Sequence, residues 1–365
     1  MKLALVHDDF IQWGGAERLV SALHEVFPDA PIFTSFYDET VIRQSPLRNA
    51  DLRVSFMQKL PLKKKIYRWY APLFPVAFEL FDLTEFDVVV SSSTRFAHGV
   101  LTKPGTIHIA YCNTPARMFW ESPTYFEKKP ISFVSSAILT YLRAWDQVAS
   151  QRADYWIANS AFVATKIRKV YKKDADIIYP CVDTDKFLKK DFVPKEKEYF
   201  LVVSRLLSYK RIDLAIRACE MEGKNLVIIG DGPDRSRLEK LAGPHTRVLG
   251  WLTDDEVVGY YQNCLALIFP GVEYFGITPL EALAAGKPVI AARNGGCLES
   301  LIEGVTGVFF TPGNMEDLVA RIHEFQEDRY QKNELLSRAQ KFSVGQFQKQ
   351  FSSYITRIRR KDLSV

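Results

Sequence analysis

Two glutamates lie eight positions apart in an otherwise apolar stretch, EYFGITPLEALAAGKPVIA, which begins at Glu273. The second of them, Glu281, comes three residues after Thr278, and Pro279 lies between them. This spacing is typical of a helix start with a capping box, in which Thr278 is the N-cap and Pro279 the first helical residue. Gly286 then predicts the end of the helix. A capping role is therefore one explanation of Glu281.

Glu273 needs a different explanation, because it lies in the loop after a predicted strand, residues 265–270. The backbone amides of Gly276, Ile277 and Thr278 come just before the predicted helix, where amides and the helix dipole bind anions such as phosphate. A carboxylate beside such a site could hold a sugar hydroxyl next to a phosphate. The alternative is a solvated loop glutamate without a ligand.

Strands alternate with helices along the chain, a pattern that predicts parallel sheets with helices on both faces. We predict an α/β protein of two doubly wound, Rossmann-like domains that face each other across a cleft. Ligands of such folds bind at the carboxyl ends of the strands, where Glu273 lies. The predicted strands are 3–7, 86–93, 107–113, 154–160, 199–206, 225–230, 247–251, 265–270 and 288–292.

The length of 365 residues also favours two domains, since single hydrophobic cores rarely grow beyond about 250–300 residues. We expect an N-terminal domain over residues 1–190 and a C-terminal domain over residues 195–342. A charged stretch without apolar periodicity, residues 189–198, is the expected linker. The C-terminal segment, residues 343–365, has helical spacing and is expected to pack back on the first domain.

The net charge of +5 is compatible with an anionic ligand or an anionic membrane surface, but it is too small to indicate nucleic acid. The 5 cysteines are scattered without a CxxC pair, which fits a reducing compartment. The N-terminus, MKLALVHDDF, reads as a buried strand rather than a signal peptide. No apolar run approaches the roughly 18 residues of a membrane span. We therefore expect a cytoplasmic protein.

The string FGITPLEALAAGKPVIA, with Glu273 and Glu281 in register, closely resembles the signature of family 4 glycosyltransferases. These are retaining enzymes of the GT-B fold that use nucleotide sugars. The resemblance covers nearly the whole chain and is firmest over residues 199–311. It implies that Glu273 faces the donor sugar and that Glu281 holds the ribose hydroxyls. The residues implied to line the donor between these two are Phe275, Gly276, Ile277 and Thr278.

The same resemblance assigns a basic pair to the donor diphosphate. In the family an arginine and then a lysine follow a strand of the second domain, and VVSRLLSYKRID places Arg205 and Lys210 in that pattern. Fixed cations would stabilise the charge that develops on a nucleoside diphosphate leaving group. Gly230, in IIGDGPDRSRL, would lie near the nucleoside. The alternative for Arg205 and Lys210 is a solvated basic loop.

In the first domain, WGGAERL resembles the family's glycine loop before its first helix. Gly14 and Gly15 would let the backbone approach the donor phosphate.

A departure from the family pattern falls in HIAYCNTPARMFW, residues 108–120. It resembles a segment written YCHTPxRxxW in enzymes that build polysaccharides on lipid carriers, many of them mannosyltransferases. The family's histidine contacts the donor sugar, and Asn113 replaces it here; asparagine can hydrogen-bond a hydroxyl but cannot act as a base. We predict structural roles for His98 and His108. Arg117 either meets an anionic acceptor or braces its loop.

A basic and aromatic stretch, residues 57–78, contains no acidic residue. Such a mixture suits the headgroup layer of an anionic membrane, and the alternative is a solvated basic face over core aromatics. The residues that we single out in it as candidates for acceptor or membrane contact are Lys63, Lys64, Lys65, Arg68 and Trp69.

Two Asp-x-Asp pairs, Asp174/Asp176 and Asp183/Asp185, could suggest a metal-dependent transferase. Surface turns explain both pairs better, because they lie around the segment between the domains. We predict no metal ion and no cofactor.

The sequence thus predicts a retaining hexosyltransferase, peripheral on the inner face of a membrane. Its donor would be a nucleotide diphosphate sugar, with GDP-mannose the first choice because of YCNTPARMFW, and its acceptor a growing lipid-linked oligosaccharide. One alternative is a UDP-hexose-dependent transferase of the same fold. Another is a degenerate module that binds a nucleotide without turnover, which the asparagine at position 113 favours and intact Glu273, Glu281, Arg205 and Lys210 oppose.

Overall fold

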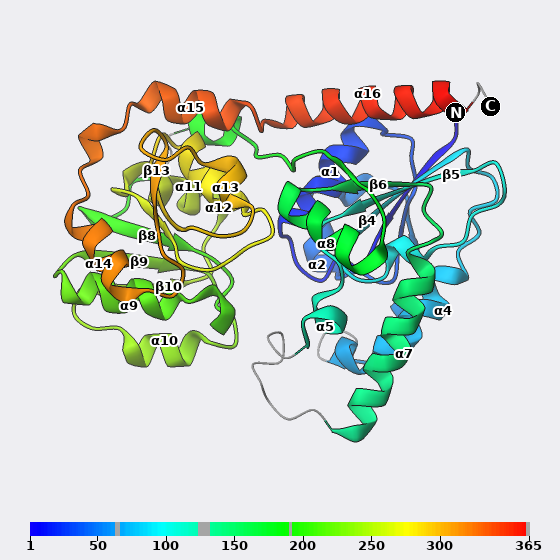
Figure 1. Ribbon diagram of the computed structural model, residues 1–365, viewed down its shortest axis with the longest axis horizontal. Coiled ribbons are helices and arrows are strands. Elements are labelled where there is room, and N and C mark those ends of the chain that lie inside the picture. Colours follow the sequence, from blue (N-terminus) through cyan, green and yellow to red (C-terminus); the bar gives the residue numbers. More distant parts are fainter. Residues whose placement is uncertain (63–65, 123–131, 190–191, 363–365) are drawn as a thin grey trace. The chain divides into compact units, whose positions relative to one another are not determined.

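A computed structural model describes residues 1–62, 66–122, 132–189 and 192–362 of the chain. The chain forms two compact units (Figure 1). The first contains residues 1–179 and the chain from Gln348 onward, and the second contains Pro180–Phe347. The division falls before the expected boundary at residue 190, because Phe187 already packs edge-on against Tyr261 of the second unit.

The first unit is built on one parallel sheet in the order β3-β2-β1-β4-β5-β6-β7. The chain starts in the middle of this sheet: β2 and β3 follow on one side of β1, and β4 to β7 follow on its other side. The carboxyl ends of β1 and β4 are therefore the topological switch point. The strands are β1 (Leu3–His7), β2 (Ile32–Thr34), β3 (Leu52–Val54), β4 (Val88–Ser93), β5 (Ile107–Cys112), β6 (Tyr155–Ala158) and β7 (Asp176–Ile177).

Helices connect these strands in the right order for a doubly wound fold. The α-helices are α1 (Gly15–Val26), α2 (Glu39–Arg43), α4 (Phe74–Glu79), α5 (Arg117–Trp120), α7 (Phe133–Ala149), α8 (Ala161–Tyr171) and α16 (Val344–Asp362), whose residues from Gln348 onward belong to this unit. Short 3-10 helices are η1 (Pro46–Asn49), η2 (Phe56–Lys59), η3 (Tyr67–Leu73) and η4 (Ala97–Gly99).

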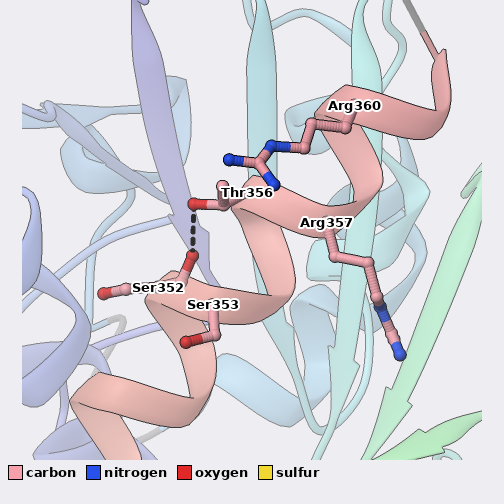
Figure 2. A pocket seen from close by; sticks show the side chains of 5 residues that line it. All are labelled: Ser352, Ser353, Thr356, Arg357 and Arg360. Carbon is pink, nitrogen blue, oxygen red and sulfur yellow. Dashed lines mark hydrogen bonds between the residues drawn. The ribbon is translucent and has the colours of Figure 1, made fainter. Parts of the chain in front are cut away.

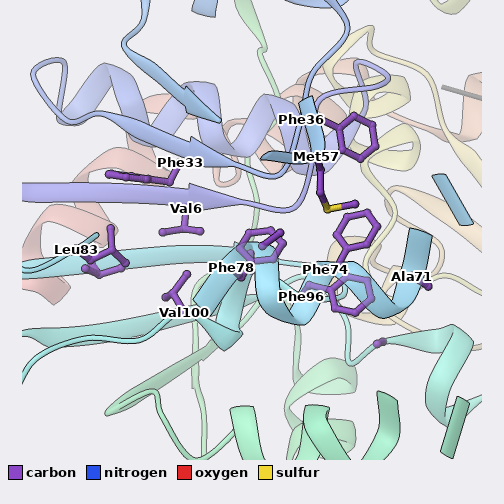
Figure 3. Close-up of a cluster of buried hydrophobic side chains, with 14 of the residues drawn as sticks. Val6, Phe33, Phe36, Met57, Ala71, Phe74, Phe78, Leu83, Phe96 and Val100 are labelled. Atoms are coloured by element: carbon purple, nitrogen blue, oxygen red, sulfur yellow. The ribbon is translucent and has the colours of Figure 1, made fainter. Parts of the chain in front are cut away.

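One face of the first sheet is covered by an aromatic core (Figure 3). Alternate strand residues such as Ala4 and Val6 point into it, as the two-residue period of a strand requires. The ring of Phe96 stacks on Phe74 with 4.6 Å between centroids, and Trp145 of α7 packs against the same Phe96 ring. This core fixes η3, α4 and α7 against the sheet.

The second unit repeats the architecture with a parallel sheet in the order β10-β9-β8-β11-β12-β13. Its switch point lies between β8 and β11, which pair in parallel with Leu267 opposite Leu201. The prediction of two doubly wound α/β domains is therefore confirmed. The strands are β8 (Tyr199–Val203), β9 (Asn225–Ile229), β10 (Thr246–Gly250), β11 (Leu267–Phe269), β12 (Val289–Ala292) and β13 (Gly307–Phe310).

Alternate residues of these strands, among them Phe200 and Val202, face one buried cluster with helices α9, α10 and α14. The α-helices of the unit are α9 (Ile212–Met221), α10 (Arg235–Leu241), α11 (Asp254–Asn263), α12 (Ile277–Ala284), α13 (Cys297–Ser300), α14 (Met315–His323) and α15 (Lys332–Gln340). The 3-10 helices are η5 (Asp185–Leu188), η6 (Ser208–Lys210) and η7 (Glu327–Arg329).

Candidate active site

The strongest feature of the second unit is an ion pair between Lys210 Nζ and Glu273 Oε1 at the switch point of its sheet. Lys210 ends the short η6 after β8, and Glu273 lies in the loop after the neighbouring β11. The two loops touch because Gly271 has no side chain: a Cβ there would come within 2.8 Å of Lys210 Cα. Both paired side chains keep some exposure, 18% and 16%, so a ligand can reach them. The structure thus brings together a cation and a carboxylate that the sequence singled out.

Arg205 lies at the carboxyl end of the same strand, β8, and its side chain is exposed. It forms no ion pair with any residue that the structure describes, which leaves its guanidinium open to an anion. The loop that carries it is held by Gly230, whose φ is +133°. A Cβ at Gly230 would overlap the carbonyl oxygen of Ser204, so only glycine allows β8 and β9 to end so close together.

Helix α12 does not begin as the sequence predicted. The capping box was wrong: the N-cap is Gly276, Thr278 is the second helical residue, and no side chain caps the helix. The reason lies in packing, because Gly276 turns with a φ of +86° where a Cβ would meet the Phe269 ring at 2.8 Å. The amides of Gly276, Ile277 and Thr278 lie at this start, where a helix offers no internal acceptors. They remain candidates for an anion, and Gly286 follows the C-cap with a φ of +75° as expected.

Glu281 caps nothing and is instead held by two side chains from other segments. Its Oε1 accepts from Lys186 Nζ at 3.0 Å and its Oε2 from Tyr261 Oη at 2.9 Å. The carboxylate is 13% exposed. Sequence reasoning missed both partners, because they lie on η5 and α11, far from Glu281 in the chain. Together they fix the orientation of a carboxylate that the family resemblance assigns to ribose.

The loop between Glu273 and Phe275 rests against two further glycines that the sequence analysis did not single out. Gly296 N donates to Glu273 O at 2.9 Å, and a Cβ at Gly295 would overlap that same oxygen. Phe275 itself is buried and packs near the ring of Phe342. Its side chain therefore belongs to the core. Of Phe275, which the family resemblance implied to line the donor, only the backbone is left to contact a ligand.

In the first unit, Gly14 is the N-cap of α1 and Gly15 is its first residue. Gly14 N already donates to Glu17 Oε2 at 2.9 Å, so the protein's own carboxylate occupies that amide. Gly15 is exposed. Of the two glycines that were predicted to approach a phosphate, Gly15 is the one whose surroundings are open.

A buried acidic pair follows β1 at the switch point of this sheet, and sequence reasoning missed its role. Asp8 accepts hydrogen bonds from the backbone amides of residues 94–97 and from Thr94 Oγ1. Asp9 forms an ion pair with Arg95. Burial alone would raise the pKa of Asp8, but the Arg95 guanidinium and the hydrogen bonds outweigh it and lower that pKa. The signal in the sequence was the pair HDD directly after the first strand.

Asn113 lies just after β5 and is half-buried. Its Nδ2 donates to Ser92 Oγ at 3.1 Å and to Ser93 O at 3.4 Å, both on the neighbouring β4. Its backbone N also donates to Ser93 O, at 2.9 Å. The end of β4 thus fixes the orientation of the Asn113 side-chain amide. A side chain that positions a substrate hydroxyl needs such a fixed orientation.

His98 and His108 are both buried and lie in hydrogen-bonded surroundings. His98 Nδ1 lies 3.0 Å from Ser93 Oγ, and its Nε2 lies 3.3 Å from Asp146 Oδ1. Asp146 in turn accepts from Trp120 Nε1 at 2.7 Å, which ties α7 to the end of α5. Burial, with a smaller effect of the His98 charge, lowers the pKa of His108 to about 3. Neither ring is placed to take a proton from a substrate.

The remaining candidates of the first unit are less tightly tied to a site. Arg117, the first residue of α5, pairs with Glu121, which also pairs with Lys166; this network braces the loop. Trp69, on η3, is 81% exposed. Lys63, Lys64 and Lys65 lie outside the described residues, as does the side chain of Arg68.

A separate hollow of about 440 Å³ lies along α16 (Figure 2). Thr356 Oγ1 in its lining donates to the backbone oxygen of Ser352, and Arg357 pairs with Asp176. None of the predicted site residues borders it. Its lining residues are Ser352, Ser353, Thr356, Arg357 and Arg360.

The described part of the chain holds neither a metal-binding cluster nor a membrane-spanning helix. Within residues 1–62, 66–122, 132–189 and 192–362, no cluster of three or more histidine, cysteine or acidic side chains is arranged to hold a metal ion. Over the same ranges, no helix combines the length and the apolar character that crossing a membrane requires. The Asp-x-Asp residues take part in surface interactions: Asp174 pairs with Arg168, and Asp183 Oδ1 accepts from the amide of Asp185.

Comparisons with known proteins agree with this geometry. A family model described as Glycosyltransferase Family 4 matches residues 13–186, and one described as Glycosyl transferases group 1 matches residues 183–342. The alpha-1,3/1,6-mannosyltransferase ALG2 of Mus musculus is 26% identical, and the match covers 94% of this chain and 94% of that protein.

Solved structures show the same fold. HepE of Anabaena in complex with UDP superposes with a TM-score of 0.70 at 19% identity, covering 98% of this chain and 100% of the other. Sucrose-phosphate synthase of Thermosynechococcus elongatus superposes with a TM-score of 0.75 at 16% identity, covering 99% and 100% of the two chains. With its two Rossmann-like units and the two family models that together match residues 13–342, this chain belongs to the family 4 glycosyltransferases of the GT-B fold.

Proposed function

We propose that this chain transfers mannose, with retention of the anomeric configuration, from GDP-mannose to a growing lipid-linked oligosaccharide. The observation that carries the proposal is the Lys210–Glu273 pair at the switch point of the second sheet. We propose that Lys210 is the cation for the diphosphate and that Glu273 is the carboxylate for a sugar hydroxyl. The choice of mannose is supported by the similarity to ALG2, named as a mannosyltransferase, along 94% of the chain.

In this proposal the donor lies along the carboxyl ends of β8 and β11. Lys210 and the exposed Arg205 neutralise the diphosphate, assisted by the amides at the start of α12. Glu281 accepts hydrogen bonds from the ribose hydroxyls, and Glu273 faces the donor sugar. Because the two side-chain cations supply the charge that a leaving diphosphate needs, we propose that the reaction requires no metal ion.

Retention of configuration is proposed to follow a front-face path, in which the acceptor hydroxyl attacks on the side of the departing diphosphate. The leaving phosphate oxygen then takes the proton of that hydroxyl. The surroundings of Asn113 favour this path, because asparagine is no base and the buried His108, with its pKa near 3, remains neutral and inaccessible. Asn113 would position a sugar hydroxyl instead.

A lipid-linked acceptor requires the enzyme to work at a membrane surface. We propose that the chain docks peripherally on anionic lipid, which fits the acid-free stretch 57–78 and the exposed Trp69 within it.

A UDP-hexose is the second candidate donor, since HepE, which shares the fold, was solved with UDP. A nucleotide-binding module without turnover is the rival from another class. It is opposed by the Lys210–Glu273 pair, because a module that only binds a nucleotide needs no carboxylate at the sugar end.

The test is a transfer assay with radiolabelled GDP-mannose and UDP-glucose, polyisoprenyl diphosphate-linked oligosaccharides as acceptors, and nuclear magnetic resonance of the product's anomeric proton. We expect transfer from GDP-mannose into an α-linked product, and its loss in Lys210→Ala. Lys287→Ala is the matched control, because Lys287 is 16% exposed and ion-paired with Glu327 in the same unit. Transfer only from UDP-glucose would select the second candidate. No transfer from either donor, with nucleotide still bound, would select the module.

A further inference from the structure

We propose that His7 is a positioning residue for sugar transfer, because its ring joins the glycine loop at Gly14 to the strand end that orients Asn113. The inference rests on the proposed function in one respect, that these two segments border the reacting groups. His7 is the last residue of β1, at the switch point of the first sheet. It is 1% exposed, so its ring acts through other protein groups and not by touching a substrate.

One nitrogen of the His7 ring faces α1. Val6 points into the aromatic core on one face of the sheet (Figure 3), so the next side chain points to the opposite face. There His7 Nε2 lies 4.0 Å from Glu17 Oε1. The other oxygen of this carboxylate, Oε2, accepts from Gly14 N at 2.9 Å, and a Cβ at position 14 would lie only 3.1 Å from it. Glu17 thereby ties the start of α1 to the His7 ring.

The other nitrogen of the ring contacts β4. His7 Nδ1 lies 3.1 Å from Ser92 O, and because a carbonyl oxygen can only accept, Nδ1 carries a proton. The hydroxyl of the same serine, Ser92 Oγ, accepts from Asn113 Nδ2 at 3.1 Å. One residue of β4 therefore contacts both the His7 ring and the Asn113 amide. These contacts form a continuous path from Gly14 through His7 to Asn113.

Since Nδ1 already donates to Ser92 O, the charge of His7 is decided at Nε2. A neutral ring would turn the lone pair of Nε2 toward the Glu17 carboxylate, whereas a protonated ring offers it an N–H. Burial alone would lower the pKa of His7, but Glu17, with smaller effects of Asp8 and Asp9, outweighs it and raises that pKa above the ordinary value of 6.5. His7 therefore keeps its proton where a free histidine has begun to lose it. The proton leaves as the pH rises through the raised pKa.

The charged groups around the ring come from three segments. Glu17 faces it from α1, and Asp8 and Asp9 follow it at the end of β1. Both aspartates are bound by the loop after β4, since Asp9 pairs with Arg95 and Asp8 accepts from backbone amides. Glu17 is therefore the group that loses a charged partner when His7 is deprotonated. A buried carboxylate without its cation is unfavourable, so this loss weakens the arrangement that holds the glycine loop.

A role in stability alone does not explain a charge at this place. Apolar side chains of similar volume stabilise a buried position as well as an ion pair does, or better. An ion pair with hydrogen bonds on both sides instead fixes the direction of the groups that it contacts. Here those groups lead to Gly14 and Asn113, the two ends of the path, and both were singled out for donor contact in the sequence.

The experiment measures kcat/KM for the donor from about pH 6 to about pH 9, with the full chain and three variants. His7→Asn keeps a donor near the position of Nδ1 and removes the group at Nε2. His7→Gln places a neutral donor near the position of Nε2. His108→Gln is the matched control, because His108 is another fully buried histidine of the same sheet, and its pKa of about 3 keeps it neutral over this range. Denaturant unfolding is measured for every variant.

We expect kcat/KM of the wild type to fall about tenfold as the pH rises through the raised pKa of His7. His7→Asn should begin about tenfold lower and stay flat, so that the two profiles converge in alkali. His7→Gln should recover part of the transfer without the pH dependence. His108→Gln should keep the wild-type profile, even where it is less stable. An alkaline fall that His7→Asn retains would overturn the inference.

Nuclear magnetic resonance of the ¹⁵N-labelled wild-type chain tests the path without any variant. The backbone amide of Gly14 and the side-chain amide of Asn113 should shift with the same midpoint as the His7 ring. A ring that titrates below the ordinary value of 6.5, or amides that do not follow it, would overturn the inference. If the wild type transfers no sugar at any pH while both amides follow the ring, the proposed function fails and the path from Gly14 to Asn113 stands.

Discussion

The ammonium of Lys210 and the carboxylate of Glu273 form an ion pair between two loops that are 63 residues apart in the chain. The loops meet because β8 and β11 are neighbours at the reversal point of the second sheet. In this pair each group neutralises the charge of the other. A bound diphosphate would draw Lys210 to itself and leave Glu273 free to accept from a sugar hydroxyl.

Glu273→Gln should separate binding from transfer. The variant keeps the shape of the side chain but removes its charge, and Lys210 loses the partner that competes with the diphosphate. We expect nucleoside diphosphate affinity to stay the same or increase, and sugar transfer to fall about 100-fold, as for other groups that stabilise a transition state. Titration calorimetry and the transfer assay together check this. Weaker nucleotide binding with normal transfer would show that Glu273 serves the nucleotide instead.

The role of Glu281 can be tested with the ligand as well as with the protein. Glu281→Gln leaves one acceptor oxygen in place of two, so it should weaken binding of the nucleoside diphosphate by roughly 10-fold to 100-fold. Binding of the 2′,3′-dideoxy nucleotide, which lacks the ribose hydroxyls, should be weak for the wild type and unchanged by the substitution.

Glu220→Gln is the control for that experiment. Glu220 lies in the same unit and accepts hydrogen bonds from Thr246 Oγ1 at 2.7 Å and Gly243 N at 3.1 Å, away from the predicted site residues. If Glu281→Gln lost as much affinity for the dideoxy nucleotide as for the ordinary nucleoside diphosphate, Glu281 would act through the structure and not through ribose.

Gly230→Ala should lower both stability and nucleotide affinity, because its Cβ would overlap Ser204 O and displace the loop of Arg205. Gly304→Ala is the matched control: its φ is also positive, +75°, but no atom lies within 4 Å of the added Cβ. The control should lose about 1 kcal/mol of unfolding free energy, from backbone strain alone. Gly230→Ala should lose about 2–4 kcal/mol, since overlap adds to strain. Denaturant unfolding measures both, and equal losses would contradict the close approach of the two loops.

Asp8 gives a prediction about pH. Its pKa in the folded chain lies below the ordinary value of 3.8, because Arg95 and its hydrogen bonds favour the charged form despite burial. Its contribution to stability is therefore complete above that ordinary value and is lost as the pH falls through the lowered one. Near neutral pH, Asp8→Asn should reduce the free energy of unfolding by about 2–4 kcal/mol. The difference between the two proteins should shrink in acid.

Asp82→Asn is the control for the pH experiment. Asp82 also accepts hydrogen bonds from a threonine, Thr84, but it is exposed, so its replacement should leave unfolding nearly unchanged. A difference between wild type and Asp8→Asn that does not depend on pH would mean that the carboxylate of Asp8 contributes shape and not charge.

The architecture was predictable because it depends on local patterns. Apolar strand runs alternating with amphipathic helices gave two doubly wound units, and a glycine loop after the first strand marked the start of α1. The rule that ligands bind where parallel strands end at a switch point predicted the position of Glu273 at the end of its strand, whereas its ion pair with Lys210 was not predicted.

Tertiary contacts decided what the sequence could not show. The residues around Thr278 match the local pattern of a capping box, yet Gly276 is the N-cap of the helix. The reason is a tertiary contact, because the Phe269 ring leaves no room for a side chain at position 276. The partners of Glu281 lie on segments whose approach no spacing reveals. The acidic pair after β1 is likewise bound to Arg95, which is 87 positions from Asp8.

The most direct test of the account is calorimetric titration of the wild-type chain and of Lys210→Ala with GDP, UDP, ADP and dTDP, without added metal. Lys287→Ala, which removes an ion-paired lysine of similar exposure from the same unit, serves as the control. We expect that one nucleotide, GDP, binds the wild type and Lys287→Ala with equal affinity and that Lys210→Ala loses this binding. Binding of no nucleotide, or equal binding by Lys210→Ala, would contradict the assignment of the diphosphate site to the end of β8.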